Sequence, residues 1–177
     1  MDPRVRDHAE VLVDWSARIE DGDNVVVMVE EGTHDLAVAV ARVLGERGAN
    51  PTFEYSSSEV RRAFVNAREE DFESEPAHEL ALFEGADSVL HLGGGRNTME
   101  LSDIPDEVRQ RYRRSREAIS EARLDTKWVG TLHPTRAMAQ QAGMSFEAYR
   151  DFVYEATLRD WESLAEEMAQ MKAILDE

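Results

Sequence analysis

The segment VLHLGGGRN, residues 89–97, has the composition of a phosphate-binding loop, because an apolar strand runs directly into three glycines. A P-loop requires G-x-x-x-x-G-K-[ST], in which the lysine reaches the phosphates and the hydroxyl reaches magnesium. A dinucleotide-binding loop requires G-x-G-x-x-G. Counted from Gly93, Thr98 stands at the last glycine of both patterns, and no lysine follows it. The segment is therefore interpreted as a flexible loop after a strand, and nucleotide binding is not predicted.

Histidine and carboxylate side chains offer a second chemistry, metal-assisted hydrolysis. A zinc-peptidase helix carries H-E-x-x-H, which places two imidazoles on one helix face. His78 and Glu79 begin this pattern, but Leu82 stands where the second histidine is required. The other histidines occur singly in separate segments: His8, His34, His91 and His133. No metal ligand and no catalytic residue is therefore assigned within the chain.

Nucleophilic catalysis is not indicated by the remaining residues. The chain has no cysteine, which excludes disulfides, thiolate metal sites and a thiol nucleophile. The G-x-S-x-G pattern of α/β-hydrolases is absent. The serines at 56–58 are better explained as a loop and a helix cap, because Ser56 and Glu59 have the spacing of a capping box.

Net charge narrows the classes of partner. The 177 residues include 37 Asp and Glu against 20 Lys and Arg, giving a formal charge of −17, and Lys127 and Lys172 are the only lysines. Such a field repels nucleic acids and anionic membranes, so neither is expected as a partner. An acidic, lysine-poor composition is typical of a halophilic protein, in which molar salt screens the repulsion. No apolar run approaches the ~20 residues that span a bilayer, and we expect a cytoplasmic protein.

Apolar patterning predicts the elements that must position these residues. Strands are expected at 24–30, 51–55, 88–92 and 126–132, of which NVVVMVE has no alternation and reads as a strand covered on both faces. An opening helix is expected after the cap Asp2, and Thr33 is expected to cap a second helix that ends at Gly48. Ser56 is expected to cap a helix that carries Val60, Phe64 and Val65. Further helices are expected at 76–84, 105–122, from Thr135 to Gly143 and at 161–175, and Ser145 is expected to cap one that buries Tyr149, Phe152, Val153 and Ala156. The charged stretch 68–76 is expected on the surface.

Strands that alternate with helices predict an α/β fold with a doubly wound, mostly parallel four-stranded sheet and helices on both faces. Ligands of such sheets bind beyond the carboxyl ends of the strands. The residues expected to line that crevice are Glu30, Gly93, Gly94, Gly95, Asn97, Thr131, His133 and Thr135. They either bind a ligand or only shape the loops. The helix that Thr135 caps would present its positive N-terminus there, which suits a carboxylate.

The second half of the chain carries a family resemblance. Pro134-Thr135 followed by Ala-Gln, AGMS at 142–145 and FVY at 152–154 lie within a strand–helix–helix segment, residues 128–161. With DGDNVVV and RGANPTFEY in the first half, this resembles the N-terminal half of the thermophilic-type metallo-aminopeptidase family, which includes aminopeptidase T, aminopeptidase S and related leucyl aminopeptidases. The three glycines and His133 depart from the usual sequence of that family. The resemblance extends over essentially the whole chain.

The resemblance implies a function for the longer protein. Family members release N-terminal amino acids from peptides with two divalent metal ions (zinc, cobalt or manganese), whose ligands lie in the C-terminal half, beyond Glu177. Residues 1–160 would be a non-catalytic N-terminal domain, and residues 161–177 a terminal helix that connects to the absent catalytic domain. The implied partners are that catalytic domain, a peptide substrate and a second copy in a homodimer. The alternative is a free-standing module of the same fold that binds a small ligand or a protein.

Overall fold

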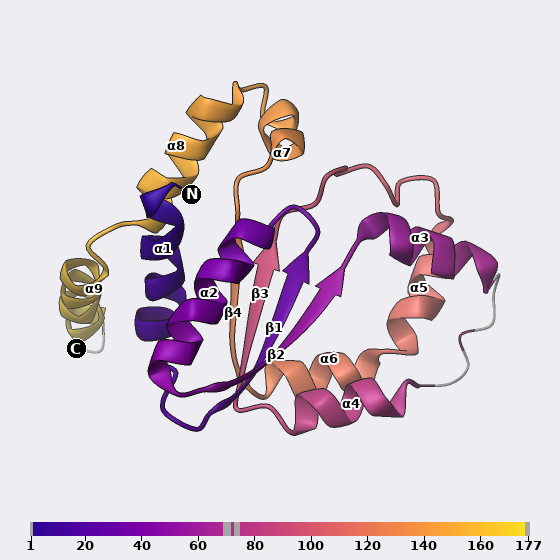
Figure 1. The fold of residues 1–177 in the computed structure, drawn as a ribbon, viewed down its shortest axis with the longest axis horizontal. Helices are drawn as coiled ribbons and strands as arrows, with labels where there is room; N and C mark the ends of the chain where they lie inside the picture. Colours follow the sequence, from indigo (N-terminus) through magenta and orange to yellow (C-terminus); the bar gives the residue numbers. More distant parts are fainter. Residues whose placement is uncertain (1, 69–71, 73–74, 176–177) are drawn as a thin grey trace.

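Four parallel strands form the centre of the fold (Figure 1). In the computed structural model, which describes residues 2–68, 72 and 75–175, the strands are β1 (Asn24–Glu30), β2 (Asn50–Ser56), β3 (Ser88–Gly93) and β4 (Lys127–Leu132). Their order in the sheet is β2-β1-β3-β4, and each pairs with its neighbours in parallel. The predicted doubly wound α/β fold is confirmed.

Helices cover both faces of the sheet (Figure 1). On one face lie α1 (Pro3–Glu10), its wider π-helical continuation η1 (Val11–Ser16), α2 (His34–Arg47) and α8 (Phe146–Thr157), and on the other α4 (Ala77–Glu84) and α6 (Glu117–Leu124). The remaining helices are α3 (Ser58–Ala67), α5 (Asp106–Arg114), α7 (Arg136–Gln141) and α9 (Trp161–Leu175). Of these, α3 and α5 meet at one end of the molecule, over a small core of Val65, Phe72 and Ile104.

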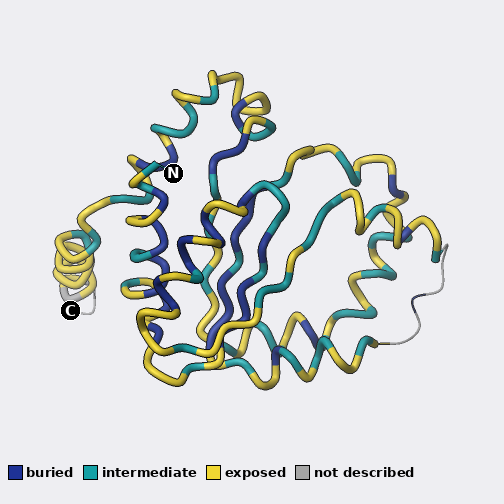
Figure 2. The backbone as a smooth tube through the Cα atoms, in the orientation of Figure 1, coloured by how far each residue is buried: buried dark blue, intermediate teal, exposed yellow. Residues whose placement is uncertain are grey.

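The central strands are buried on both sides, as their apolar runs predict (Figure 2). Val25, Val27 and Val29 of β1 pack in the core under α1 and α2, and Val26 packs in the core under α4 and α6. The outer strands differ from these, because each has one unpaired edge. On β4, Trp128 and Leu132 keep about half of their surface exposed.

Two local predictions are wrong, each for a physical reason. The helix expected at 105–122 is broken at Ser115 and Arg116, because the Ser115 hydroxyl donates to the carbonyl of Tyr112 and closes α5. Ser57, not Ser56, caps α3, and its hydroxyl accepts from the N–H groups of Glu59 and Val60. The predicted surface stretch 68–76 lies mostly outside the described residues.

A third difference concerns α8, which places only part of its apolar stripe in the core. Val153 is buried as expected, whereas Phe152 keeps 59% of its surface exposed and Ala156 is exposed as well. The buried aromatic residue of this helix is Tyr154. The stripe therefore faces the edge of β4 rather than the interior.

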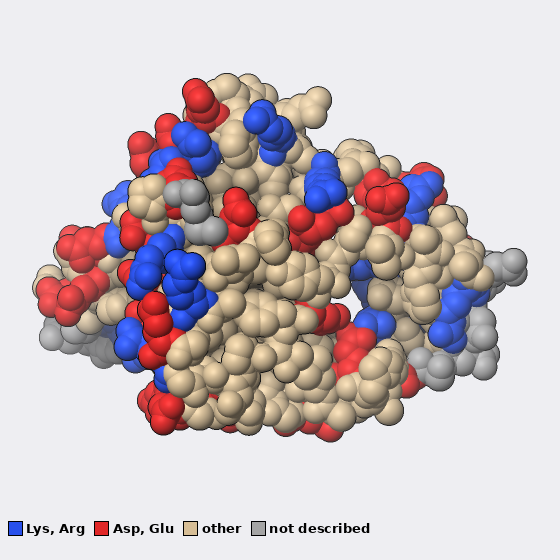
Figure 3. Space-filling view, in the orientation of Figure 1, with Lys and Arg blue, Asp and Glu red and all other residues tan. Residues whose placement is uncertain are grey.

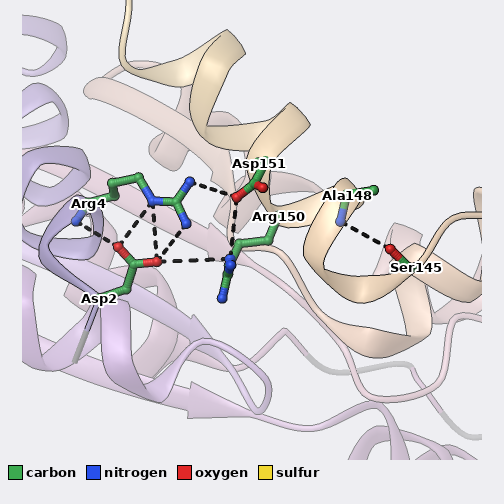
Figure 4. A network of polar contacts seen from close by, with 6 residues as sticks. All are labelled: Asp2, Arg4, Ser145, Ala148, Arg150 and Asp151. Atoms are coloured by element: carbon green, nitrogen blue, oxygen red, sulfur yellow. Dashed lines mark hydrogen bonds and ion pairs between the residues drawn. The ribbon is translucent and has the colours of Figure 1, made fainter.

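An ion network fixes α8 against the start of the chain (Figure 4). The Arg4 guanidinium donates to Asp151 at 2.8 Å and to Asp2 at 2.7 Å, and Arg150 lies 3.6 Å from Asp151. The hydrogen bond from Arg4 lowers the pKa of Asp2 to about 2. Because α1 packs on α2, the network holds α8 beside the sheet.

No helix within the described part of the chain is long and apolar enough to cross a membrane.

Candidate functional site at the carboxyl ends of the strands

The order of the strands places a topological switch point between β1 and β3, where ligands of open α/β sheets bind. Glu30 ends β1, and Gly93 to Gly95 end β3 and begin the next loop. The Glu30 Oε2 atom accepts a hydrogen bond of 2.8 Å from the N–H of Gly94. A carboxylate of the protein thus takes the backbone donor that a phosphate oxygen would need. The geometry supports the prediction that this loop is not a nucleotide site.

The loops after β1 and β3 approach each other closely. A Cβ atom placed on Gly32 would lie 1.9 Å from the carbonyl oxygen of Gly94, and one on Gly94 would lie 2.5 Å from the Thr33 methyl group. A Cβ atom placed on Gly94 would also lie 3.1 Å from the carbonyl oxygen of His133, so the loop after β4 packs against the same glycine. These glycines are needed because backbone packs directly on backbone.

The hydroxyl groups of two threonines connect these loops through hydrogen bonds. The Thr33 hydroxyl, which is fully buried, donates to the carbonyl of Glu30 at 2.8 Å and lies 3.4 Å from that of Leu92. Thr33 stands at the N-cap of α2 as predicted, but its side chain does not cap the helix. The Thr135 hydroxyl donates to the carbonyl of Gly95 and accepts from the N–H of Met138, so it caps α7 as predicted.

Glu30 is the charged group of this junction. Its Oε1 atom lies 3.6 Å from Nε2 of His91, and its side chain keeps 32% of its surface exposed. The contact with His91 lowers the pKa of Glu30, the hydrogen bond from Gly94 adds to that effect, and burial opposes it. Glu30 is therefore ionised at neutral pH and serves as an acceptor. The sequence places His91 on the strand expected at 88–92 and does not indicate its pairing with Glu30.

Thr131 contacts helix α1, which covers one face of the sheet. Its Oγ1 atom lies 2.8 Å from Nε2 of His8, a fully buried residue of α1. Burial lowers the pKa of His8 to about 4, and the nearby His133 adds to this shift. Burial lowers the pKa of His133 as well. Within the described part of the chain, the Nδ1 atom of each ring is buried and has no hydrogen-bond partner, so both sites favour the neutral imidazole.

The structure brings together six of the eight residues predicted to line the crevice. Glu30, Gly93, Gly94, Gly95, His133 and Thr135 meet at the junction, where the N–H of His133 donates to the carbonyl of Gly93 at 2.8 Å. Thr131 lies behind them with His8. Asn97 bonds within its own turn, to the N–H of Met99 and to the carboxylate of Glu100. Most contacts of the junction are thus internal to the protein.

An apolar groove of about 540 Å³ opens beside this junction, between β4 and α8. It is lined on the sheet side by His91, Gly93, Gly130, Thr131 and Leu132, and on the side of α8 by Tyr149, Phe152, Val153, Ala156 and Thr157. None of its lining residues is acidic, although 37 of the 177 residues of the chain are Asp or Glu. Sequence periodicity marks Phe152 and Ala156 as apolar stripe residues but cannot show that they face a groove.

The side chains present do not fit a metal centre. Glu30 and His91 are close enough to share an ion, but among the described residues no group of three or more His, Cys, Asp or Glu side chains is placed to hold one. Structural and catalytic zinc sites use at least three protein ligands. The described residues therefore offer no site that fits the two ions that the family resemblance implies.

Comparison with known structures identifies the same fold elsewhere. Wild-type AmpT from Thermus thermophilus matches with a TM-score of 0.70 at 20% sequence identity, over 88% of this chain and 42% of that chain. This chain thus spans less than half of the length of AmpT. A cysteine desulfurase from Thermococcus onnurineus NA1 matches with a TM-score of only 0.39 at 12% identity, over 72% of this chain and 26% of that one, which is too weak to bear on fold or function. No curated protein matches the sequence.

The sequence itself matches one family model. That model, the thermophilic metalloprotease family M29, covers residues 1–177. The match agrees with the resemblance that the motifs of residues 128–161 indicate, and the family is metal-dependent. The chain belongs to the thermophilic metalloprotease family M29.

Proposed function

We propose that this chain is the N-terminal, non-catalytic domain of a metal-dependent aminopeptidase that releases N-terminal amino acids from peptides. The observation that carries the proposal is the match of the M29 family over the whole chain, combined with a fold that covers 42% of AmpT. The absence of a metal-binding group among residues 2–68, 72 and 75–175 supports the non-catalytic role. The two divalent ions, zinc, cobalt or manganese, would be held by the catalytic part.

The partner of this domain is the catalytic part of such an enzyme. Two apolar surfaces support this proposal: the groove between β4 and α8, and helix α9, on which Met168, Met171 and Ile174 each keep more than 60% of their surface exposed. Exposed apolar patches mark interaction sites, and the unpaired edge of β4 adds free backbone donors and acceptors. Helix α9 connects the two parts. The intact enzyme is cytoplasmic and dimeric.

The role of this chain inside the enzyme is to wall the substrate cavity. The junction of Glu30, Gly94 and Thr135 holds the three loops at the carboxyl ends of the strands in one arrangement. Rigid loops suit a cavity wall, because a peptide is oriented by surfaces that do not move on binding.

Metal binding tests the proposal. Cobalt or zinc is titrated into the chain in molar potassium chloride and followed by calorimetry, with AmpT as the positive control. We expect no stoichiometric binding, because at most two ligands meet at any described position. Tight binding that Glu30→Gln abolishes would assign a metal centre to this domain and contradict the scaffold role.

A further inference from the structure

The pocket between α3 and α5 is separate from the strand-end junction and combines basic with apolar groups. It has a volume of about 170 Å³. Its rim carries three arginines, Arg61, Arg109 and Arg113, and its apolar lining is formed by Val65, Leu101, Ile104 and Tyr112. Val65 and Ile104 are 4% and 5% exposed, so the floor of the pocket belongs to the small core of this end of the molecule.

The concentration of positive charge there is unusual for this protein. Net charge is −17, yet each of the three charged residues that line the pocket is an arginine. Figure 3 shows basic side chains beside acidic ones at the end formed by α3 and α5. Asp103 pairs with Arg62, and Asp106 pairs with Arg109 at the rim, so the positive charge left at the pocket comes from Arg61 and Arg113.

Two of the three guanidinium groups have no partner in the described part of the protein. Neither Arg61 nor Arg113 forms a hydrogen bond or ion pair, and both side chains are exposed. The charge of Arg61 also acts to lower the pKa values of Glu30 and Glu54. Five donors in a planar fork allow an arginine to bind a carboxylate through two parallel hydrogen bonds.

The volume of the apolar part of the pocket limits the size of the apolar group that a bound carboxylate can carry. A dry cavity of ~150 Å³ lined by apolar side chains holds a benzene ring, so a pocket of this volume takes one branched aliphatic or small aromatic side chain. A cation would be repelled by Arg61 and Arg113, and an inorganic anion would leave the apolar floor unfilled.

We propose that the α3–α5 pocket binds the carboxylate of an apolar amino acid, with Arg61 and Arg113 holding the carboxylate and the apolar floor receiving the side chain. A free amino acid and the C-terminal residue of a peptide share this chemistry. The proposal does not depend on the aminopeptidase role, because it rests on the pocket alone.

Calorimetric titration with four probes tests the proposal, in the potassium chloride concentration that keeps the chain folded. N-acetyl-L-leucine represents a peptide C-terminus, and L-leucine a free amino acid. N-acetyl-L-leucinamide lacks the carboxylate charge, and N-acetylglycine lacks the side chain. We expect binding of the first or second probe and no detectable binding of the amide or of the glycine derivative. Whichever of the first two binds more tightly identifies the source of the carboxylate.

Substitutions place the binding in the pocket. Arg61→Gln and Arg113→Gln are each expected to weaken binding roughly tenfold, because each removes a charged hydrogen-bond donor. Arg114→Gln is the matched control, since Arg114 is exposed on the same helix but does not line the pocket, and it should leave the affinity unchanged. Circular dichroism checks that all three variants are folded. If no probe binds, if the amide binds as well as the acid, or if all three variants bind like the original chain, the proposal is wrong.

Discussion

The Nε2 atom of His8 lies 2.8 Å from the Oγ1 atom of Thr131, so a fully buried imidazole joins the first helix to the last strand. The ring packs edge-on against Tyr154 of α8, with ring centroids 6.1 Å apart. Three elements that are distant in sequence thus meet at one titratable side chain. Because its Nδ1 atom is buried without a partner, the site accommodates the neutral ring and disfavours the imidazolium.

Stability should therefore fall as the pH is lowered from about 6.5 to about 4. The pKa of His8 falls from 6.5 in a free side chain to about 4 in the fold, so the unfolded chain takes up a proton that the folded chain resists. Above pH 6.5, the pKa of the unfolded chain, His8 is neutral in both states and stability is at its full value. Between pH 6.5 and about 4, the folded pKa, stability is lost progressively, by about 3 kcal/mol in total. Urea unfolding across this pH range, at constant salt, measures it.

His8→Gln separates this contribution from that of other groups. Glutamine offers Thr131 a hydrogen-bonding group but does not titrate, so this variant should lose most of the slope between pH 6.5 and 4. His78→Gln changes an exposed histidine on α4 and should keep the full slope. Equal slopes in His8→Gln and the original chain would show that other groups cause the acid sensitivity.

Glu30 is predicted to stabilise the strand-end junction through its bond to Gly94. Glu30→Ala should lower the free energy of unfolding by about 1–2 kcal/mol, the contribution of a half-exposed hydrogen bond to a charged group. Glu31→Ala is the neighbouring control, and its effect should be smaller, because Glu31 accepts only a long bond of 3.4 Å from Arg96. Denaturant unfolding at neutral pH compares the two. Equal losses would argue against a special role of Glu30.

Close backbone packing at the junction makes Gly32 intolerant of any side chain. Gly32→Ala should destabilise the protein by about 1–3 kcal/mol, because its methyl group would meet a backbone oxygen that cannot move alone. Gly45→Ala, in the last turn of α2 with open space at its Cβ position, should instead stabilise by up to ~1 kcal/mol. The opposite signs are measured by thermal unfolding of both variants. A neutral Gly32→Ala would mean that the loops do not pack as described.

Salt should raise the melting temperature. A net charge of −17 makes the folded chain repel itself, and potassium chloride screens this repulsion. The melting temperature is measured from millimolar to molar potassium chloride, with sucrose as a non-ionic control for general exclusion effects. We expect a large rise in potassium chloride and a small one in sucrose. A melting temperature that stays flat in potassium chloride would contradict the halophilic interpretation.

Local chemistry explains which elements could be predicted from the sequence. The valines of β1 exclude a one-sided strand, and Asp2, Thr135 and Ser145 cap their helices through bonds that reach only two or three residues along the chain. The break between α5 and α6 combines the local bond from Ser115 to Tyr112 with a tertiary contact, the ion pair of Arg116 with Glu79 of α4, and no helical pattern indicates that second contact. The outward position of Phe152 likewise depends on where α8 meets β4.

The residues of the candidate site likewise fall into those that the sequence predicts and those that only the fold brings together. Glu30, the glycines at 93–95 and Thr135 follow from the rule that the carboxyl ends of parallel strands meet at one edge. The bond between His8 and Thr131 joins residues 123 positions apart, and no pattern in either segment indicates it. Thr33 is predicted to cap α2, but its hydroxyl contacts the carbonyls of Glu30 and Leu92 instead, and these contacts depend on the fold.

Hydrolysis of a leucine chromogenic amide is the most direct test of the scaffold role. The folded 177-residue chain is assayed in molar potassium chloride with cobalt or zinc added, and AmpT serves as the positive control. The account predicts no metal-dependent release of the chromophore, because no described group of side chains can hold a metal ion. Metal-dependent hydrolysis by this chain, abolished by a chelator and restored by the metal, would contradict the account and place a catalytic centre within these residues.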